Sequence, residues 1–188
     1  MRIIAGARKG LRLEVPPGRL VRPTADRARE GLMSALGGFF DGEVVLELCA
    51  GTGAVALELL SRGCSDAVLV ERDPTALACI RRNVERAAMV DRVEVVAGGV
   101  LEALPRLVAR GRRFDLLFLD PPYDADLVEP VLERLADGAL LNPGARIIVE
   151  VRRSAASLPL ASPWQLQASH HYGDCTMLRL LHKIGARP

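Results

Sequence analysis

Aromatic side chains are scarce in this 188-residue chain, and it contains no long apolar run. Phe, Trp and Tyr make up 4% of the residues, so the core must be built mostly from Leu, Val and Ala. No apolar run approaches the roughly 20 residues that a membrane-spanning helix needs. Gly6, Arg8 and Lys9 interrupt any signal-peptide core after Arg2. We therefore expect a soluble, cytoplasmic protein.

Cysteine is also rare, and its spacing excludes the common cysteine sites. No two cysteines form a CxxC pair, and none stands at zinc-ligand spacing from a histidine. We expect four small buried side chains in a reducing compartment, without a disulfide and without a metal ion. These residues are Cys49, Cys64, Cys79 and Cys175.

Basic and acidic side chains are nearly equal in number over the whole chain, but they are unevenly distributed along the sequence. The net charge is +2. Residues 1–30 hold eight basic and three acidic side chains, whereas residues 31–188 hold 17 basic and 20 acidic ones. A basic head on a slightly acidic body predicts a segment that faces a polyanion.

The head reads as a hairpin followed by a helix. Arg2–Ala5 and Leu11–Val15 are predicted strands, and the glycine-bounded turn between them suits positive φ. A helix is expected after Pro23, with Thr24 as its N-cap, ending at Gly37-Gly38. The length favours one main domain with a small appendage. We therefore divide the chain into an extension, residues 1–20, and a domain, residues 21–188.

From residue 43 onward, apolar strands alternate with helices, which predicts an α/β fold with a mostly parallel sheet covered on both faces. Two further strands, Trp164–Ser169 and Thr176–His182, read as a hairpin closing the sheet edge. The other expected strands are Glu43–Leu48, Ala67–Glu71, Val93–Ala97, Phe114–Leu119 and Arg146–Val151. The expected helices are Ala54–Arg62, Pro74–Ala88, Leu101–Ala109 and Leu127–Asp137.

A glycine turn follows the first of these strands. Gly51 and Gly53 stand between that strand and a helix, where small residues let a ligand approach the backbone and the helix N–H groups. Glu71 ends the next strand, 20 residues after Gly51, and can accept hydrogen bonds from ribose hydroxyls. Asp73 is the second choice for this role. NAD and S-adenosylmethionine both fit these residues.

Glu47 distinguishes between these two candidate cofactors. It stands four residues before Gly51 in a mostly apolar strand end, where its charge would repel a pyrophosphate. The α-ammonium group of an amino acid cofactor would instead be attracted, directly or through water. Glu47 therefore favours S-adenosylmethionine.

Asp120-Pro121-Pro122-Tyr123 follows another strand of the same sheet. The prolines stiffen the loop and leave carbonyl groups free to accept hydrogen bonds. The Asp120 carboxylate and the Pro121 carbonyl can bind the two N–H groups of a nucleobase amine and stabilise the positive charge that develops on methylation. Tyr123 can stack on a base that has left its helix.

On these residues the chain resembles a family. Asp-Pro-Pro-Tyr is similar to the signature of amino-directed nucleic-acid methyltransferases. The whole chain looks like the bacterial 16S ribosomal RNA guanine-N2 methyltransferases of the RsmD type. The segments that carry this likeness are Arg2–Gly6 with Gly10, Arg22–Glu30, Leu48–Gly53, and Tyr172-Gly173-Asp174 with Thr176.

The resemblance implies a Rossmann-like class I fold with a seven-stranded sheet, and a cytoplasmic monomer. Such a protein would methylate the N2 amine of guanine 966, within 16S rRNA of an assembled 30S particle, with S-adenosylmethionine as donor. By position, Glu47, Gly51, Gly53, Glu71 and Gly99 would hold the cofactor; Asp120, Pro121 and Tyr123 would hold the guanine. The expected RNA contacts are Arg8, Lys9, Arg22, Thr24, Arg27 and Arg29.

The chain departs from the family pattern at two places. The family usually has Asp where this chain has Glu47, which is longer by one carbon. After the third strand, relatives often carry a polar side chain that reads the adenine amine, but here Gly98 and Gly99 follow Ala97. Backbone groups at Gly99 or the side chain of Glu102 could replace it.

Three other functions are compatible with parts of the sequence. The same loop could methylate DNA or a protein glutamine, and only the head argues against this. An NAD-dependent oxidoreductase would need a hydride-transfer partner such as Tyr-x-x-x-Lys, which we do not find. A non-catalytic RNA-binding or ribosome-assembly factor would need neither the glycine turn nor Asp120.

Overall fold

The computed structural model describes residues 1–16, 23–122, 125–155, 160 and 162–183, with only the backbone for residues 23–28 and 155. Within these residues, seven strands form one sheet in the order β3-β2-β1-β4-β5-β7-β6. All pairs up to β5 are parallel, whereas β7 runs antiparallel to both β5 and β6. The strands are β1 (Val44–Leu48), β2 (Asp66–Glu71), β3 (Val93–Ala97), β4 (Phe114–Leu119), β5 (Leu141–Arg152), β6 (Trp164–Tyr172) and β7 (Cys175–His182).

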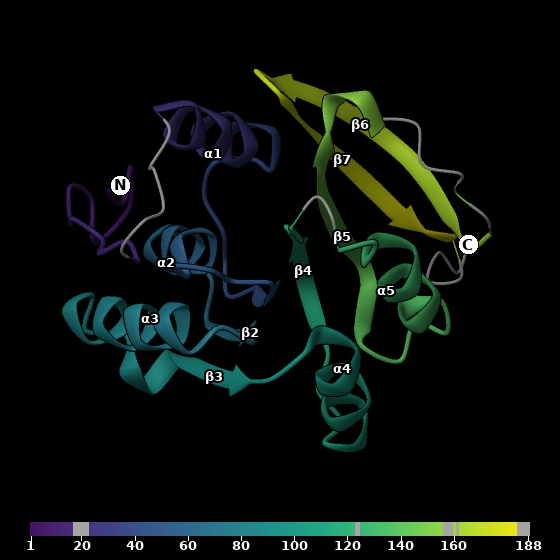
Figure 1. The fold of residues 1–188 in the computed structure, drawn as a ribbon, viewed down its shortest axis with the longest axis horizontal. Helices are drawn as coiled ribbons and strands as arrows, with labels where there is room; N and C mark the ends of the chain where they lie inside the picture. The colour runs from purple at the N-terminus through teal and green to yellow at the C-terminus, as the bar shows by residue number, and fades with distance from the viewer. Residues whose placement is uncertain (17–22, 123–124, 156–159, 161, 184–188) are drawn as a thin grey trace.

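Helices cover both faces of the sheet, as Figure 1 shows. One core layer joins α1, α2 and α3 to the sheet and includes Met33, Leu57 and Ile80. A second layer joins α4 and α5 to the opposite face. The helices are α1 (Pro23–Ala35), α2 (Ala54–Ser61), α3 (Pro74–Arg86), α4 (Val100–Ala109) and α5 (Val128–Leu135). The predicted α/β fold with a mostly parallel seven-stranded sheet is confirmed.

The register of the central strands brings the loops that follow them together. Leu48, at the end of β1, is paired with Val70 on one side and with Leu119 on the other. The glycine turn, the end of β2 and the Asp120 loop therefore leave the sheet at the same edge. This edge is where parallel α/β sheets bind their ligands.

The N-terminal hairpin is only partly as predicted. Its two segments pair through a single antiparallel bridge between Arg2 and Arg12 rather than through two regular strands. Ile3 and Leu13 are buried in the same core layer as α1 and α2. The segment of residues 1–14 therefore packs through its apolar side chains onto the helices, and its basic side chains Arg8 and Lys9 remain exposed.

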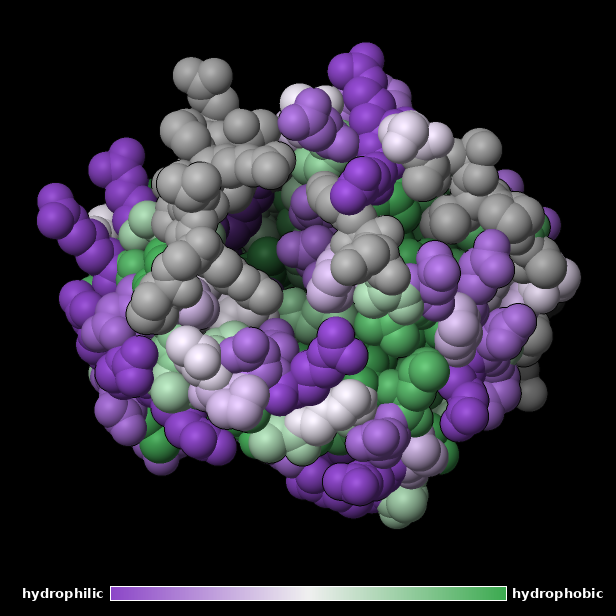
Figure 2. All heavy atoms as spheres, viewed as in Figure 1, coloured by the Kyte–Doolittle hydropathy of each residue, from purple (hydrophilic) through white to green (hydrophobic). Residues whose placement is uncertain are grey.

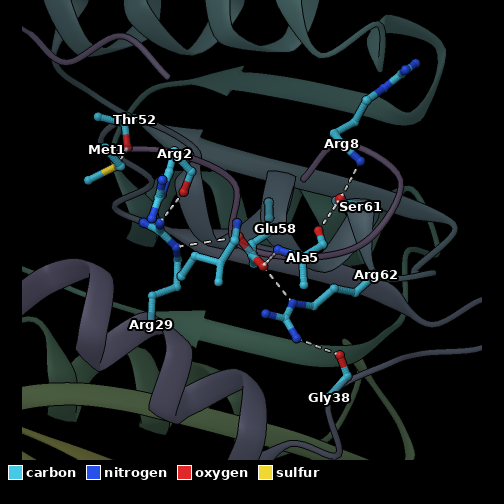
Figure 3. A network of polar contacts seen from close by, with 12 residues as sticks. Met1, Arg2, Ala5, Arg8, Arg29, Gly38, Thr52, Glu58, Ser61 and Arg62 are labelled. Carbon is cyan, nitrogen blue, oxygen red and sulfur yellow. Dashed lines mark hydrogen bonds and ion pairs between the residues drawn. The ribbon is translucent and has the colours of Figure 1, made fainter. Parts of the chain in front are cut away.

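Glu58 of α2, which has no solvent exposure, holds this segment in place (Figure 3). Its carboxylate accepts hydrogen bonds from the backbone N–H groups of Ile4, at 2.6 Å, and Ala5, at 3.0 Å. The Nε of Arg62 lies 2.7 Å from the same carboxylate, and the Nε of Arg29 lies 3.9 Å from it. A buried charge is tolerated only when it is paired and hydrogen-bonded in this way.

A second buried polar residue ties the segment to the glycine turn. The Asn83 side chain accepts from the backbone N–H of Glu14 and donates to the backbone carbonyls of Glu14 and Thr52. Asn83 is fully buried in α3. Asn83 of α3 therefore connects the N-terminal segment to the glycine turn.

The four cysteines are free thiols, and all but Cys49 are buried. Among the described residues, no helix is both long and apolar enough to cross a membrane.

We expect Glu58→Gln to lower the free energy of unfolding by about 3 kcal/mol, because it leaves two buried arginines without their counter-charge. Urea denaturation followed by circular dichroism measures this change. Glu85→Gln, at an exposed position of α3, is the matched control and should stay within about 0.5 kcal/mol of the parent. Equal stability of the two variants would show that Glu58 does not hold the segment.

Candidate functional site

A cavity of about 1010 Å³ opens at the carboxyl edge of the sheet. Its wall includes the glycine turn, the ends of β2 and β4, residues of α1, and the turn between β6 and β7. Figure 2 shows a hollow near the centre of the face drawn, with both polar and apolar side chains around it. The volume suffices for a nucleoside-sized ligand.

The glycine turn has the left-handed backbone that favours glycine. Gly51 has φ 58° and Gly53 has φ 72°, and Gly53 is the N-cap of α2. A Cβ atom on Gly53 would lie 2.7 Å from Cδ2 of Leu69, so a side chain at this position would clash. Cys49 also has a positive φ, 59°, and lines the cavity. Such strain at a non-glycine residue is typical of functional loops.

The Glu71 carboxylate organises the neighbouring backbone. It accepts hydrogen bonds from the N–H groups of Gly51, at 2.7 Å, Arg72, at 2.8 Å, and Asp73, at 2.9 Å. Glu71 is buried, yet it lines the cavity. Asp73, the second choice for its role, instead caps α3 by accepting from the N–H groups of Thr75 and Ala76.

Glu47 is almost completely buried beneath the start of α2. Its Oε2 accepts a hydrogen bond from the N–H of Ala56 at 2.9 Å, and the residue lines the cavity. Burial raises the pKa of this carboxyl from 4.5 to about 8; hydrogen bonds from α2 and the positive charge of Arg29 oppose the rise. The side chain is therefore protonated at neutral pH in the absence of a cation.

Asp120 and Pro121 lie at the same edge. Asp120 directly follows β4, and its N–H continues the pairing with Leu48 of β1. Both residues line the cavity; Asp120 is exposed, and Pro121 is buried. The third predicted residue of this loop, Tyr123, lies outside the described residues.

Gly98 and Gly99 line the corner of the cavity that follows β3. Gly99 is the N-cap of α4, and the N–H of Gly98 donates to the carbonyl of Glu71. The Glu102 carboxylate folds back toward this corner: its Oε2 lies 3.7 Å from the place of a Cβ on Gly99. Glu102 lines the cavity as well.

The residues predicted to contact RNA do not all lie on one surface of the described structure. Arg8 and Lys9 are exposed in the turn of the hairpin. Arg22 lies outside the described residues, and only the backbone of Thr24 and Arg27 is described. Arg29 differs from its expected place on the RNA side, because it is 4% exposed and forms part of the cavity wall.

Some residues of the cavity wall were not predicted. Tyr172, Asp174 and Glu150 line it from the C-terminal hairpin and from β5. Tyr172 packs closely on Gly31 of α1, since a Cβ at Gly31 would lie 2.4 Å from its hydroxyl oxygen. The Tyr172-Gly173-Asp174 motif marked this turn in the sequence, but only the antiparallel return of β7 brings it to the cavity. Within the described residues, no group of three His, Cys, Asp or Glu side chains could hold a metal ion.

Comparisons with known proteins agree with this geometry. The family described as conserved hypothetical protein 95 matches residues 1–180. The ribosomal RNA small subunit methyltransferase D of Escherichia coli K12 is 31% identical over 166 residues, covering 88% of this chain and 82% of the relative. The protein of the same name from Haemophilus influenzae is 31% identical over 169 residues, covering 88% and 86%.

A solved Escherichia coli structure, whose description proposes a methyltransferase, aligns with a TM-score of 0.84 and 30% identity. It covers 97% of this chain and 98% of that chain. The likeness confirms the predicted Rossmann-like class I methyltransferase fold.

We expect the stability difference between Glu47→Gln and the parent protein to depend on pH. The folded-state pKa is raised, so the contribution of Glu47 is fully present below pH 4.5 and is lost as the pH rises toward about 8. Glutamine cannot ionise, and its advantage should therefore grow by at least about 1 kcal/mol between about pH 5 and pH 8. Urea denaturation across this range measures it. Parallel stability curves would contradict the burial of an ionisable Glu47.

Proposed function

Because the chain belongs to the conserved hypothetical protein 95 family, which includes the RsmD-type ribosomal RNA methyltransferases, we propose that it methylates ribosomal RNA of the small subunit. The donor is S-adenosylmethionine, and the acceptor is the exocyclic N2 amine of guanine 966 in 16S rRNA. The observation that carries this proposal is a single cavity lined by Glu47, Glu71 and Asp120.

The residues around the glycine turn suit S-adenosylmethionine. The left-handed turn at Gly53 begins α2, and Gly51, Ala54 and Val55 on either side of it line the cavity, so a ligand can approach the start of this helix. Glu47 would accept a hydrogen bond from the α-ammonium group. Glu71 would accept hydrogen bonds from the ribose hydroxyls through the carboxylate lone pairs that its backbone N–H partners do not use. Gly99 would hold the adenine end. When bound, the sulfonium supplies an electrophilic methyl group.

Asp120 and Pro121 then hold the guanine amine. The carboxylate and the carbonyl accept its two N–H groups, which turns the nitrogen lone pair toward the methyl group and stabilises the developing positive charge. Asp120 need not be a strong base, because the methylated amine becomes acidic and loses its proton late. Tyr123 stacks on the flipped base.

The head supplies the RNA-facing surface in this proposal. Residues 1–20 are the proposed RNA-facing extension, with Arg8 and Lys9 on its exposed turn. We propose that Arg22, Thr24 and Arg27 also contact the RNA. The substrate is an assembled 30S particle, and the enzyme acts in the cytoplasm as a monomer without a metal ion.

Labelled S-adenosylmethionine tests the function against its alternatives in one assay. The protein is incubated separately with 30S particles, naked 16S RNA, DNA and a protein substrate. Label in guanine N2 of the particle supports the proposal. Label only in DNA or protein would identify another amino methyltransferase, and RNA binding without any label would identify a binding factor.

We expect Asp120→Ala to reduce methyl transfer about 100-fold or more, the scale of a lost electrostatic contact to the transition state. Binding of S-adenosylhomocysteine, measured by calorimetry, should change less than about threefold, because Asp120 contacts the base in this proposal. Asp91→Ala, at an exposed position away from the cavity, is the control. Normal turnover of the Asp120 variant would remove this residue from the chemistry.

We expect Arg8→Gln with Lys9→Gln to weaken RNA binding and to reduce the slope of log affinity against log salt by about 1–2, because two phosphate contacts are lost. Filter binding over a salt series measures the slope. The matched control replaces two exposed arginines of the opposite face, Arg106 and Arg134, and should leave the slope unchanged. Equal slopes for both double variants would contradict an RNA-facing head.

A further inference from the structure

We propose that Arg29 binds the α-carboxylate of the amino acid portion of the cofactor, opposite the ammonium site at Glu47. This inference rests on the proposed function, since it assumes that S-adenosylmethionine occupies the cavity. It assigns to Arg29 a cofactor contact in place of the RNA contact that the sequence predicts.

The position of Arg29 is the first support. Arg29 is 4% exposed and lines the same cavity as Glu47 and Gly51. Figure 3 shows its side chain extending from α1 toward Arg2 and Glu58. One guanidinium nitrogen, Nη2, donates to the backbone carbonyl of Arg2 at 2.5 Å. A side chain held in this way is poorly placed to reach the phosphate backbone of an RNA outside the protein.

The distribution of charge is the second support. Of the ionisable side chains that line the cavity in the described part of the chain, seven are acidic, and only Arg29 and Arg72 are basic. Arg72 is exposed beside Glu71, at the ribose end. A carboxylate at the amino acid end would therefore meet repulsion from acidic groups unless Arg29 balanced its charge.

Arg29 lies between two acidic side chains, Glu58 and Glu47. Glu58 pairs closely with Arg62, at 2.7 Å, but lies 3.9 Å from Nε of Arg29. The positive charge of Arg29 also acts on Glu47, whose pKa burial raises to about 8. Because Arg29 and Glu47 line the same cavity, a zwitterion can bind both: its ammonium stabilises ionised Glu47, and its carboxylate pairs with Arg29.

Arginine also suits this task by its shape. Its planar guanidinium presents several donors in a fixed fork and can bind a carboxylate through two parallel hydrogen bonds. The contact to the Arg2 carbonyl fixes the fork from the other side. The N-terminal segment would therefore orient the residue that reads the cofactor.

The test compares two ligands that differ only in this carboxylate, S-adenosylhomocysteine and its decarboxylated analogue, by calorimetry. We expect the parent protein to bind S-adenosylhomocysteine about 30-fold more tightly, the scale of a charge-assisted contact. Equal affinity for the two ligands would overturn the assignment without any variant. Failure to bind either ligand would instead contradict the proposed function.

Two variants then locate the effect. In Arg29→Met the preference should fall to about threefold or less, because only the affinity for the carboxylate-bearing ligand decreases. Arg62→Met removes the other arginine of Glu58, which does not line the cavity, and should keep the parent preference despite lower stability. Circular dichroism confirms folding of both. A full preference in Arg29→Met, with or without weaker RNA binding, would overturn the proposal.

Discussion

The buried carboxylate of Glu58 is the contact on which the candidate site depends. It lies on α2, the helix that begins at the glycine turn, and it binds the backbone of Ile4 and Ala5 together with the guanidinium of Arg62. Arg62 in turn donates to the carbonyl of Gly38, in the loop that follows α1. The segment of residues 1–14, the loop after α1 and α2 are therefore fixed to one another through one charged group. The cavity wall contains residues from this segment, from α1 and from α2.

Two acidic residues of the cavity, Glu71 and Glu47, hold the surrounding backbone in place without a ligand. Glu71 accepts three backbone N–H groups, and Glu47 accepts one from the first turn of α2. These hydrogen bonds hold the two carboxyl groups in one place, so little reorganisation is needed when a ligand binds. The same groups thus stabilise the loop geometry and provide acceptors in the cavity. Such double use explains why acids are tolerated in so buried a position.

Most elements could be predicted because their signals are local. Apolar runs bounded by glycine, proline or aspartate located β3 and β4 to the residue and most other ends to within two. Two of the exceptions arise from contacts with residues distant in sequence. β5 begins earlier than expected, at Leu141, because an irregular register lets this residue pair with Phe114 of β4. The head forms a single bridge because its apolar residues pack on the helices instead of extending a sheet.

The residue types at the strand ends, and their meeting at one edge, followed from the sequence alone. Glycine at positive φ, an acid after β2 and the stiff Asp120-Pro121 loop are local properties, and parallel strands bring such loops together. The place of Arg29 was decided only by the tertiary structure. Because Arg29 stands near other basic residues in the sequence, the sequence predicts that it belongs to a solvated, RNA-facing surface. Its burial depends on Arg2, Glu47 and Glu58, which approach it only when the head, β1 and α2 pack together.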